Sequence, residues 1–184
     1  MWPEAGAMLT PAAALLLIYP HDGRWQIPLT IRGAGLRHHT NQVSLPGGRI
    51  DHPGESVEEA ALREAEEEIG ISRNAIEIVG RLTPVPIAVS AHLLHPVVGV
   101  CAERPAFSIA FPEVERLIEL PLAKLLEPDT VAFDRRVRPP HVVQIVPYFD
   151  VEGAHVWGAT AMVLAEFAAL FESGSATGRD AISI

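Results

Sequence analysis

The chain has a single cysteine, and this shortage excludes one class of protein. Cys101 is the only cysteine among 184 residues, so no disulfide can form within the chain. It ends the apolar run Val97–Cys101, where a cysteine is expected to be a small buried hydrophobe. A fold held by internal disulfides is therefore excluded, and the reduced thiol suits a cytoplasmic location.

Positive charge is also scarce. The chain has 14 lysines and arginines against 23 aspartates and glutamates, which gives a formal net charge of −9. Binding to nucleic acid without sequence preference, or to an anionic membrane, requires a basic face. We therefore expect no nucleic acid and no membrane as partners, although metal ions and a few local cations can still bind a small polyanionic substrate.

No apolar run is long enough to cross a bilayer. The longest candidate near the start is Ala12–Ile18, which is far shorter than a membrane span, and no basic segment precedes it, so a signal peptide is not expected. Pro11 and Pro20 bound this run, and the pattern predicts a buried first strand.

The length and composition predict one domain. With 48% hydrophobic residues, 184 residues suffice for one core, and no internal repeat is visible. We expect a single domain over residues 1–171 and a polar, frayed tail over 172–184. Further strands are predicted at 25–31, 77–81, 95–101 and 142–149, a short helix at 122–126, and long helices at 56–69 and 157–171. This order suggests an α/β/α sandwich with a mixed β-sheet.

The helix predicted over 56–69 has clear ends and an acidic side. Ser56 and Glu59 form a capping box at its start, and Gly70 is the expected stop. Glu64, Glu67 and Glu68 fall on one side of a 3.6-residue helix, where their repulsion would be relieved by a divalent cation such as Mg²⁺ or Mn²⁺. A solvated acidic face is the alternative, but it does not explain the Pro46–Gly48 turn or Arg63 among the acids.

The segment Arg63-Glu64-Ala65-Glu66-Glu67-Glu68-Ile69-Gly70-Ile71 resembles the second half of the Nudix hydrolase signature. The first half is one residue longer than the general signature, because six residues separate Gly48 from Glu55. This longer loop is similar to that of the coenzyme A pyrophosphatase branch. The upstream residues Leu29–Arg32, Leu36–Arg37 and Val43–Gly48 resemble the accessory motif of the same branch, with Asn41 and Leu45 as departures.

The resemblance implies a Nudix-type sandwich fold and a metal-dependent pyrophosphohydrolase. It implies Mg²⁺ or Mn²⁺ as the cofactor, bound by the Gly48 carbonyl and by Glu64, Glu67 and Glu68. Arg63 is expected to orient these acids, with Glu55 as its partner, because its planar fork can donate two parallel hydrogen bonds to one carboxylate. The general base is left between Glu64 and Glu113.

Coenzyme A or its thioesters are the substrates that the resemblance implies. Another nucleoside-diphosphate derivative, such as ADP-ribose, a nucleotide sugar or a dinucleotide, and a non-catalytic sensor are the alternatives. One compact cationic group could bind the 3′-phosphate of coenzyme A or be a surface cluster; it consists of Arg32, Arg37, His38 and His39. The same two interpretations apply to Arg135, Arg136 and Arg138, which the sequence places in a loop bounded by prolines. Trp25, Trp157 and Phe149 are expected to fill the core rather than to stack on a base. The oligomeric state stays open, with a homodimer as one alternative.

Overall fold

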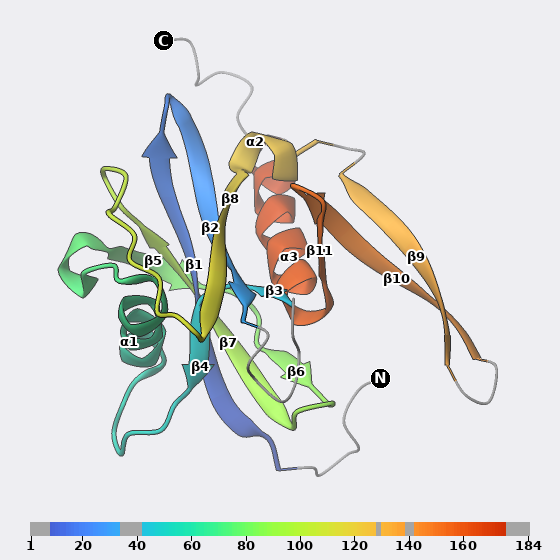
Figure 1. The fold of residues 1–184 in the computed structure, drawn as a ribbon, viewed down its shortest axis with the longest axis horizontal. Helices are drawn as coiled ribbons and strands as arrows, with labels where there is room; N and C mark the ends of the chain where they lie inside the picture. Colours follow the sequence, from blue (N-terminus) through green and yellow to red (C-terminus); the bar gives the residue numbers. More distant parts are fainter. Residues whose placement is uncertain (1–7, 34–41, 128–129, 139–141, 176–184) are drawn as a thin grey trace.

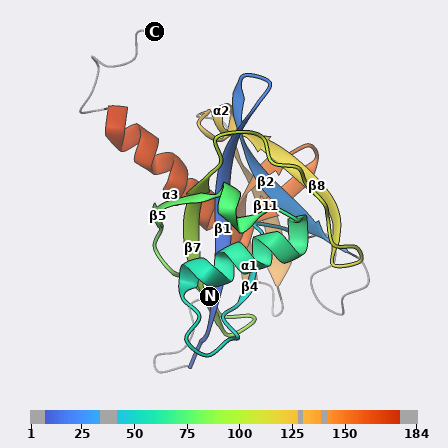
Figure 2. The same cartoon turned by 90° about the vertical axis from the view of Figure 1, so that its left-hand side faces the viewer.

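The computed structural model describes residues 8–33, 42–127, 130–138 and 142–175. Two sheets and two long helices make up this part, with helix α1 (Val57–Ile69) on one side of the large sheet and helix α3 (Gly158–Ser175) on the other (Figures 1 and 2). This is the predicted α/β/α arrangement with a mixed sheet. None of the helices in these ranges is long and apolar enough to cross a membrane.

The large sheet has eight strands. Its main path is β3-β2-β1-β7-β5, while β4 pairs with β1, β6 with β7 and β8 with β2. β1 and β7 are parallel and the other pairs are antiparallel, so the sheet is mixed. The strands are β1 (Thr10–His21), β2 (Arg24–Arg32), β3 (Val43–Ser44), β4 (Gly47–Arg49), β5 (Glu77–Arg81), β6 (Val85–Ile87), β7 (His92–Val100) and β8 (Val114–Pro121).

Strand β1 exchanges one neighbour for another along its length. Its first half, at Ala12–Ala14, pairs with β4, whereas its end, at Tyr19–His21, pairs with β2. On the opposite edge β7 follows β1 from Thr10 to Ile18. The sheet therefore divides where β1 leaves β2, and the candidate site lies at this division.

Both faces of β1 are buried, which explains its unbroken apolar run. Because side chains alternate along a strand, Leu15 and Leu17 point into the core under α1, while Ala14 and Leu16 point into the core under α3. Cys101 belongs to the core under α1 and is buried, as predicted, and the burial raises the pKa of its thiol.

Helix α1 is fixed by the signals that the sequence predicts. Ser56 is its N-cap and forms both halves of the capping box with Glu59. Gly70 ends the helix in the left-handed region at φ 72°, where glycine carries no steric cost. Ala60, Ala61 and Ala65 are fully buried, so their small side chains let the helix lie close to β1 and β4.

A separate three-stranded sheet follows the large one. It has the order β11-β10-β9, and all its pairs are antiparallel. Strands β9 and β10 form a ribbon that projects away from the body of the molecule (Figure 1). The remaining elements are the 3₁₀ helix η1 (Arg73–Ala75), helix α2 (Leu122–Leu125), and strands β9 (Val131–Arg138), β10 (Val142–Val151) and β11 (Ala154–Trp157).

Several sequence predictions need correction. Residues 131–138 form strand β9, although the prolines around Arg135 predicted a loop, and β8 and β11 had not been predicted. Helix α3 continues to Ser175, so the frayed tail does not begin at 172, and residues 176–184 lie outside the described part. Phe149 fills the core as expected, but Trp25 is 49% exposed and does not. The single-domain boundary at 171 stays a prediction.

The capping box offers a clean test of local stability. We expect Ser56→Ala to lower the free energy of unfolding by about 1 kcal/mol, because the Glu59 backbone N–H loses its acceptor. Ser72→Ala is the matched control, since Ser72 precedes η1 without a side-chain cap and should leave stability unchanged. Urea denaturation of both variants measures the difference, and equal losses would contradict the assigned cap.

Candidate functional site

A cleft of about 540 Å³ opens at the divided end of the large sheet. The floor on the α3 side is made by small β1 residues, Ala12 and Ala14. One wall contains the β4 glycines with Glu64 of α1, and another contains Arg32 at the end of β2 with Glu113. Residues distant in the sequence thus meet because β4 pairs with β1 while β8 pairs with β2.

The two glycines of β4 are required by close contacts. A Cβ atom at Gly47 would overlap Ala13 and Ala14 of β1. A Cβ atom at Gly48 would occupy the position of the Glu64 carboxylate. The Glu64 carboxylate therefore lies directly against the backbone of β4, and a side chain at position 48 would displace it.

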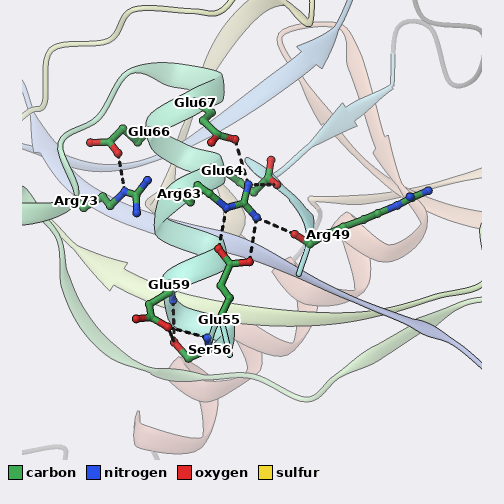
Figure 3. A network of polar contacts seen from close by, with 9 residues as sticks. All are labelled: Arg49, Glu55, Ser56, Glu59, Arg63, Glu64, Glu66, Glu67 and Arg73. Carbon is green, nitrogen blue, oxygen red and sulfur yellow. Dashed lines mark hydrogen bonds and ion pairs between the residues drawn. The ribbon is translucent and has the colours of Figure 1, made fainter. Parts of the chain in front are cut away.

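Arg63 joins α1 to β4 and to the preceding loop (Figure 3). Its Nε donates to Glu55 Oε1 at 2.8 Å, and its Nη2 donates to Glu55 Oε2 at 3.3 Å and to the Arg49 carbonyl at 2.9 Å. Its Nη1 donates to Glu64 Oε1 at 2.7 Å and to Glu67 Oε2 at 3.1 Å. Five N–H donors thus have five acceptors, and the predicted pair with Glu55 is confirmed. The bond from Arg63 also lowers the pKa of Glu55.

Two carboxylates behind the glycines are poorly solvated. Glu68 is 6% exposed and accepts a hydrogen bond from the Gly47 N–H at 3.2 Å. Burial raises its pKa to about 8. Burial also raises the pKa of Glu64, and the hydrogen bond from Arg63 opposes that rise. Each acid therefore carries an electrostatic cost when ionised, which a nearby cation would remove.

The residues fit a divalent cation by their chemistry. Glu64 rests against the Gly48 backbone and Glu68 has a single weak donor, so hard oxygen atoms of both face the same glycine strand. Glu67 is more exposed and accepts from Arg63. Within the described ranges no three His, Cys, Asp or Glu side chains are already gathered at ligand spacing. Of the predicted three-glutamate set, Glu64 lines the cleft, Glu68 lies behind Gly47 and Glu67 is more exposed, so the three do not form a closed cage and their role as ligands stays a prediction.

Glu113, one of the two candidate bases, lines the cleft, and its role stays a prediction. It lines the cleft together with Glu64, and its Oε1 atom is 3.6 Å from Arg32 Nη2. The Gly33 N–H donates to the Glu113 carbonyl at 3.0 Å, which anchors this loop to β2. Among the residues that the structure describes, none accepts a hydrogen bond from the buried Arg32 Nε. Arg37, His38 and His39 lie outside the described residues, so their assignment stays a prediction.

The opposite side of the cleft is largely apolar, although Ser90 and His92 also line it, and the sequence does not predict this side. Ile87, Val89 and Leu94 of the β6–β7 region line it, together with Trp157 and the first turn of α3. Trp157 is therefore half-buried beside the cleft rather than in the core. The sequence predicts only a helix at 157–171 and gives no sign that its first turn lines a cleft. Arg135 lies on the projecting ribbon and does not line the cleft.

Comparison with known proteins supplies the family. The NUDIX domain matches residues 8–140. The uncharacterised Nudix hydrolase NudL of Escherichia coli O7:K1 is 44% identical over 98 residues, which cover 53% of this chain and 50% of the relative. NudL of Shigella boydii serotype 18 is 43% identical with the same coverage. The chain therefore spans about half the length of the curated relatives it matches.

Solved structures agree on the fold. The Nudix hydrolase RenU from M. smegmatis has a TM-score of 0.53 and 25% identity, covering 62% of this chain and 72% of that chain. The C. elegans Ap4A hydrolase has a TM-score of 0.53 at 18% identity, covering 64% and 84%, which shows a shared fold alone. Since the NUDIX domain covers most of the chain and includes the Arg63 network, this protein belongs to the Nudix hydrolase family, which acts on pyrophosphate bonds.

Proposed function

We propose that the cleft hydrolyses the pyrophosphate of coenzyme A or its thioesters, giving 3′,5′-ADP and 4′-phosphopantetheine or its acyl form. The shape and chemistry of the cleft carry this proposal: carboxylates and Arg32 lie at one side, and Ile87, Val89 and Leu94 at the other. A diphosphate attached to a long, weakly polar arm matches both sides at once. ADP-ribose or a nucleotide sugar would place hydroxyl groups against the apolar side.

The residues of the cleft divide the work of hydrolysis. Glu64 and Glu68, with the Gly48 carbonyl and Glu67, would hold Mg²⁺ or Mn²⁺, because all of these donors are hard oxygens. A bound divalent ion supplies charge neutralisation of the diphosphate and a lower pKa for an attacking water. Arg63 holds Glu64 and Glu67 in place through Nη1. Arg32 would bind the diphosphate across from them.

Two carboxylates can accept the proton of the attacking water. Glu64 lies against Gly48, and Glu113 reaches the same cleft from the loop before β8. Glu113 is the better candidate, because Glu64 would be occupied as a ligand and already accepts from Arg63. A carboxylate that does not bind the metal keeps its lone pairs for the proton.

A cytoplasmic location stays a prediction.

The burial of Glu68 predicts that the stability of the metal-free protein depends on pH. The folded-state pKa of Glu68 lies above the reference value of 4.5, at about 8, so the native state holds an extra proton between these values. Without metal, the Glu68 carboxyl should make the free energy of unfolding of the wild type fall as pH rises from about 4.5 to about 8. Glu68→Gln lacks this group, so the variant should become more stable relative to wild type as pH rises through the same window. Denaturation at several pH values with a chelator present measures this.

The same variant tests metal binding. Glu68→Gln and Glu67→Gln should weaken Mg²⁺ binding measured by calorimetry and lower turnover by on the order of 10²–10³. Glu66→Gln is the control, because Glu66 accepts from Arg73 on the exposed side of the same helix. Unchanged Mg²⁺ affinity in the Glu68 and Glu67 variants would remove these residues from the metal site.

A substrate panel tests the proposed function. Coenzyme A, an acyl-coenzyme A, ADP-ribose, a nucleotide sugar and diadenosine tetraphosphate are assayed with Mg²⁺ and with Mn²⁺. We expect the coenzyme A compounds to have the highest kcat/KM, with 3′,5′-ADP identified by mass spectrometry. Preference for ADP-ribose would establish the alternative substrate class. Metal binding without turnover of any compound would contradict the proposed function and favour the sensor alternative.

A paired substitution separates the apolar side from the rest of the cleft. Val89→Asn should lower kcat/KM for acyl-coenzyme A several-fold while leaving ADP-ribose hydrolysis unchanged, because each buried methylene contributes roughly 0.8 kcal/mol. Val89 is 77% exposed, so the fold should not suffer. Val79→Asn is the control, since Val79 is also exposed but lies on β5, away from the cleft.

A further inference from the structure

Arg49 is a second arginine of the cleft, and no step of the proposed hydrolysis uses its side chain. It follows the two glycines of β4 and lines the cleft. Gly48 faces Glu64 under α1, and side chains alternate along a strand, so Arg49 points to the opposite face of the sheet, toward α3. Figure 3 shows its side chain directed away from Arg63 and the glutamates around it. Its carbonyl, and not its guanidinium, joins that network.

The Arg49 guanidinium forms no hydrogen bond or ion pair with any residue that the structure describes. The other two arginines beside the cleft are paired: Arg32 lies 3.6 Å from Glu113, and Arg63 donates to three glutamates. A guanidinium has five N–H donors, and its planar fork matches the oxygens of a phosphate group. Arg49 is therefore the cation of the cleft that is available to an anion of the substrate.

Two further donors lie at the same end of the cleft. On the α3 side of the sheet, Ala12 of β1 pairs with Arg49 of β4 and with Leu94 of β7. His92 begins β7 on the same face, Ser90 lies in the turn before it, and both line the cleft. Neither side chain has a partner within the described ranges. We call Arg49, Ser90 and His92 the donor cluster.

The spacing of the donor cluster suits one phosphate group. Strands β4 and β7 lie on either side of β1, so the backbones at Arg49 and Leu94 are about 10 Å apart, twice the distance between adjacent strands. The Ala12 side chain between them is small and leaves room over β1. Arg49 and His92 can therefore donate to one anion from opposite sides. The imidazole has an N–H to donate in either protonation state.

The position of the cluster indicates which anion it would bind, if the diphosphate of coenzyme A is held at Gly48 and Glu64. Arg49 is the residue after Gly48, so an anion that Arg49 binds lies close to the diphosphate. The 3′-phosphate of coenzyme A is attached to the same ribose as the diphosphate, whereas an acyl group lies at the far end of the pantetheine arm. A phosphate monoester also carries close to two negative charges at pH 7.

We propose that the donor cluster binds the 3′-phosphate of coenzyme A, and that Arg49 distinguishes coenzyme A from dephospho-coenzyme A. This inference rests on the proposed function and adds a specificity-determining residue to it. Arg32, on another wall of the cleft and beside Glu113, binds the diphosphate and does not contact the 3′-phosphate. The 3′-phosphate thus moves from the Arg32 group to an arginine that the sequence does not single out.

Kinetics with coenzyme A and dephospho-coenzyme A test the proposal. The ratio of the two kcat/KM values should favour coenzyme A by roughly tenfold in the wild type and fall to about one in Arg49→Gln. His92→Phe keeps a ring without N–H donors and should lower the ratio several-fold. Arg32→Gln should lower both kcat/KM values and keep the ratio. Arg24→Gln is the matched control, because Arg24 is an exposed strand arginine at the β1–β2 turn and does not line the cleft.

Calorimetry with 3′,5′-ADP and with 5′-AMP tests the same contact without turnover. The wild type should bind 3′,5′-ADP roughly tenfold more tightly, and Arg49→Gln should bind the two compounds equally. Equal binding by the wild type, or a preference that survives Arg49→Gln, would overturn the proposal. A preference lost in Arg32→Gln but kept in Arg49→Gln would assign the 3′-phosphate to Arg32. Arg49-dependent binding of 3′,5′-ADP without hydrolysis of coenzyme A would support the donor cluster and contradict the proposed function.

Discussion

The site depends on one largely enclosed cation among acids. Arg63 is 12% exposed at its side chain and donates to three glutamates and to the Arg49 carbonyl. These bonds tie α1, the loop before it and strand β4 into one unit. Without the guanidinium the carboxylates would repel one another beside the two glycines of β4. With it, Glu64 is held at the wall of the cleft beside Gly48, where the proposed divalent cation would bind.

The glycine strand and the small residues of β1 form the second constraint. Gly47 and Gly48 admit Glu64 and β1 to contact distance, and Ala12 and Ala14 keep the floor of the cleft open. Larger side chains follow at Leu15–Leu17, where both faces of the strand are buried in core. Strand β1 thus lines the cleft with small side chains at its start and fills the core with large side chains at its centre.

The sequence predicts the parts whose signals are local. Each of three confirmed features involves residues that are close in the sequence. They are the capping box at Ser56, the helix stop at Gly70 and the pair of Arg63 with Glu55. Parts that depend on distant pairing were not predicted. Trp157 enters the cleft through the β10–β11 hairpin, and β9 is a strand because β10 supplies its hydrogen bonds, which outweighs the prolines nearby. The meeting of Arg32 and Glu113 was likewise invisible, since it follows from the pairing of β2 with β8.

The central claim is that water attacks phosphorus in a pyrophosphate bound at the glutamate side of the cleft. Hydrolysis of coenzyme A in ¹⁸O-labelled water, followed by mass spectrometry of both products, tests it most directly. The account predicts one labelled oxygen on a phosphate group of either 3′,5′-ADP or 4′-phosphopantetheine and none on a free hydroxyl group. Release of labelled inorganic phosphate with the pyrophosphate bond intact would contradict it.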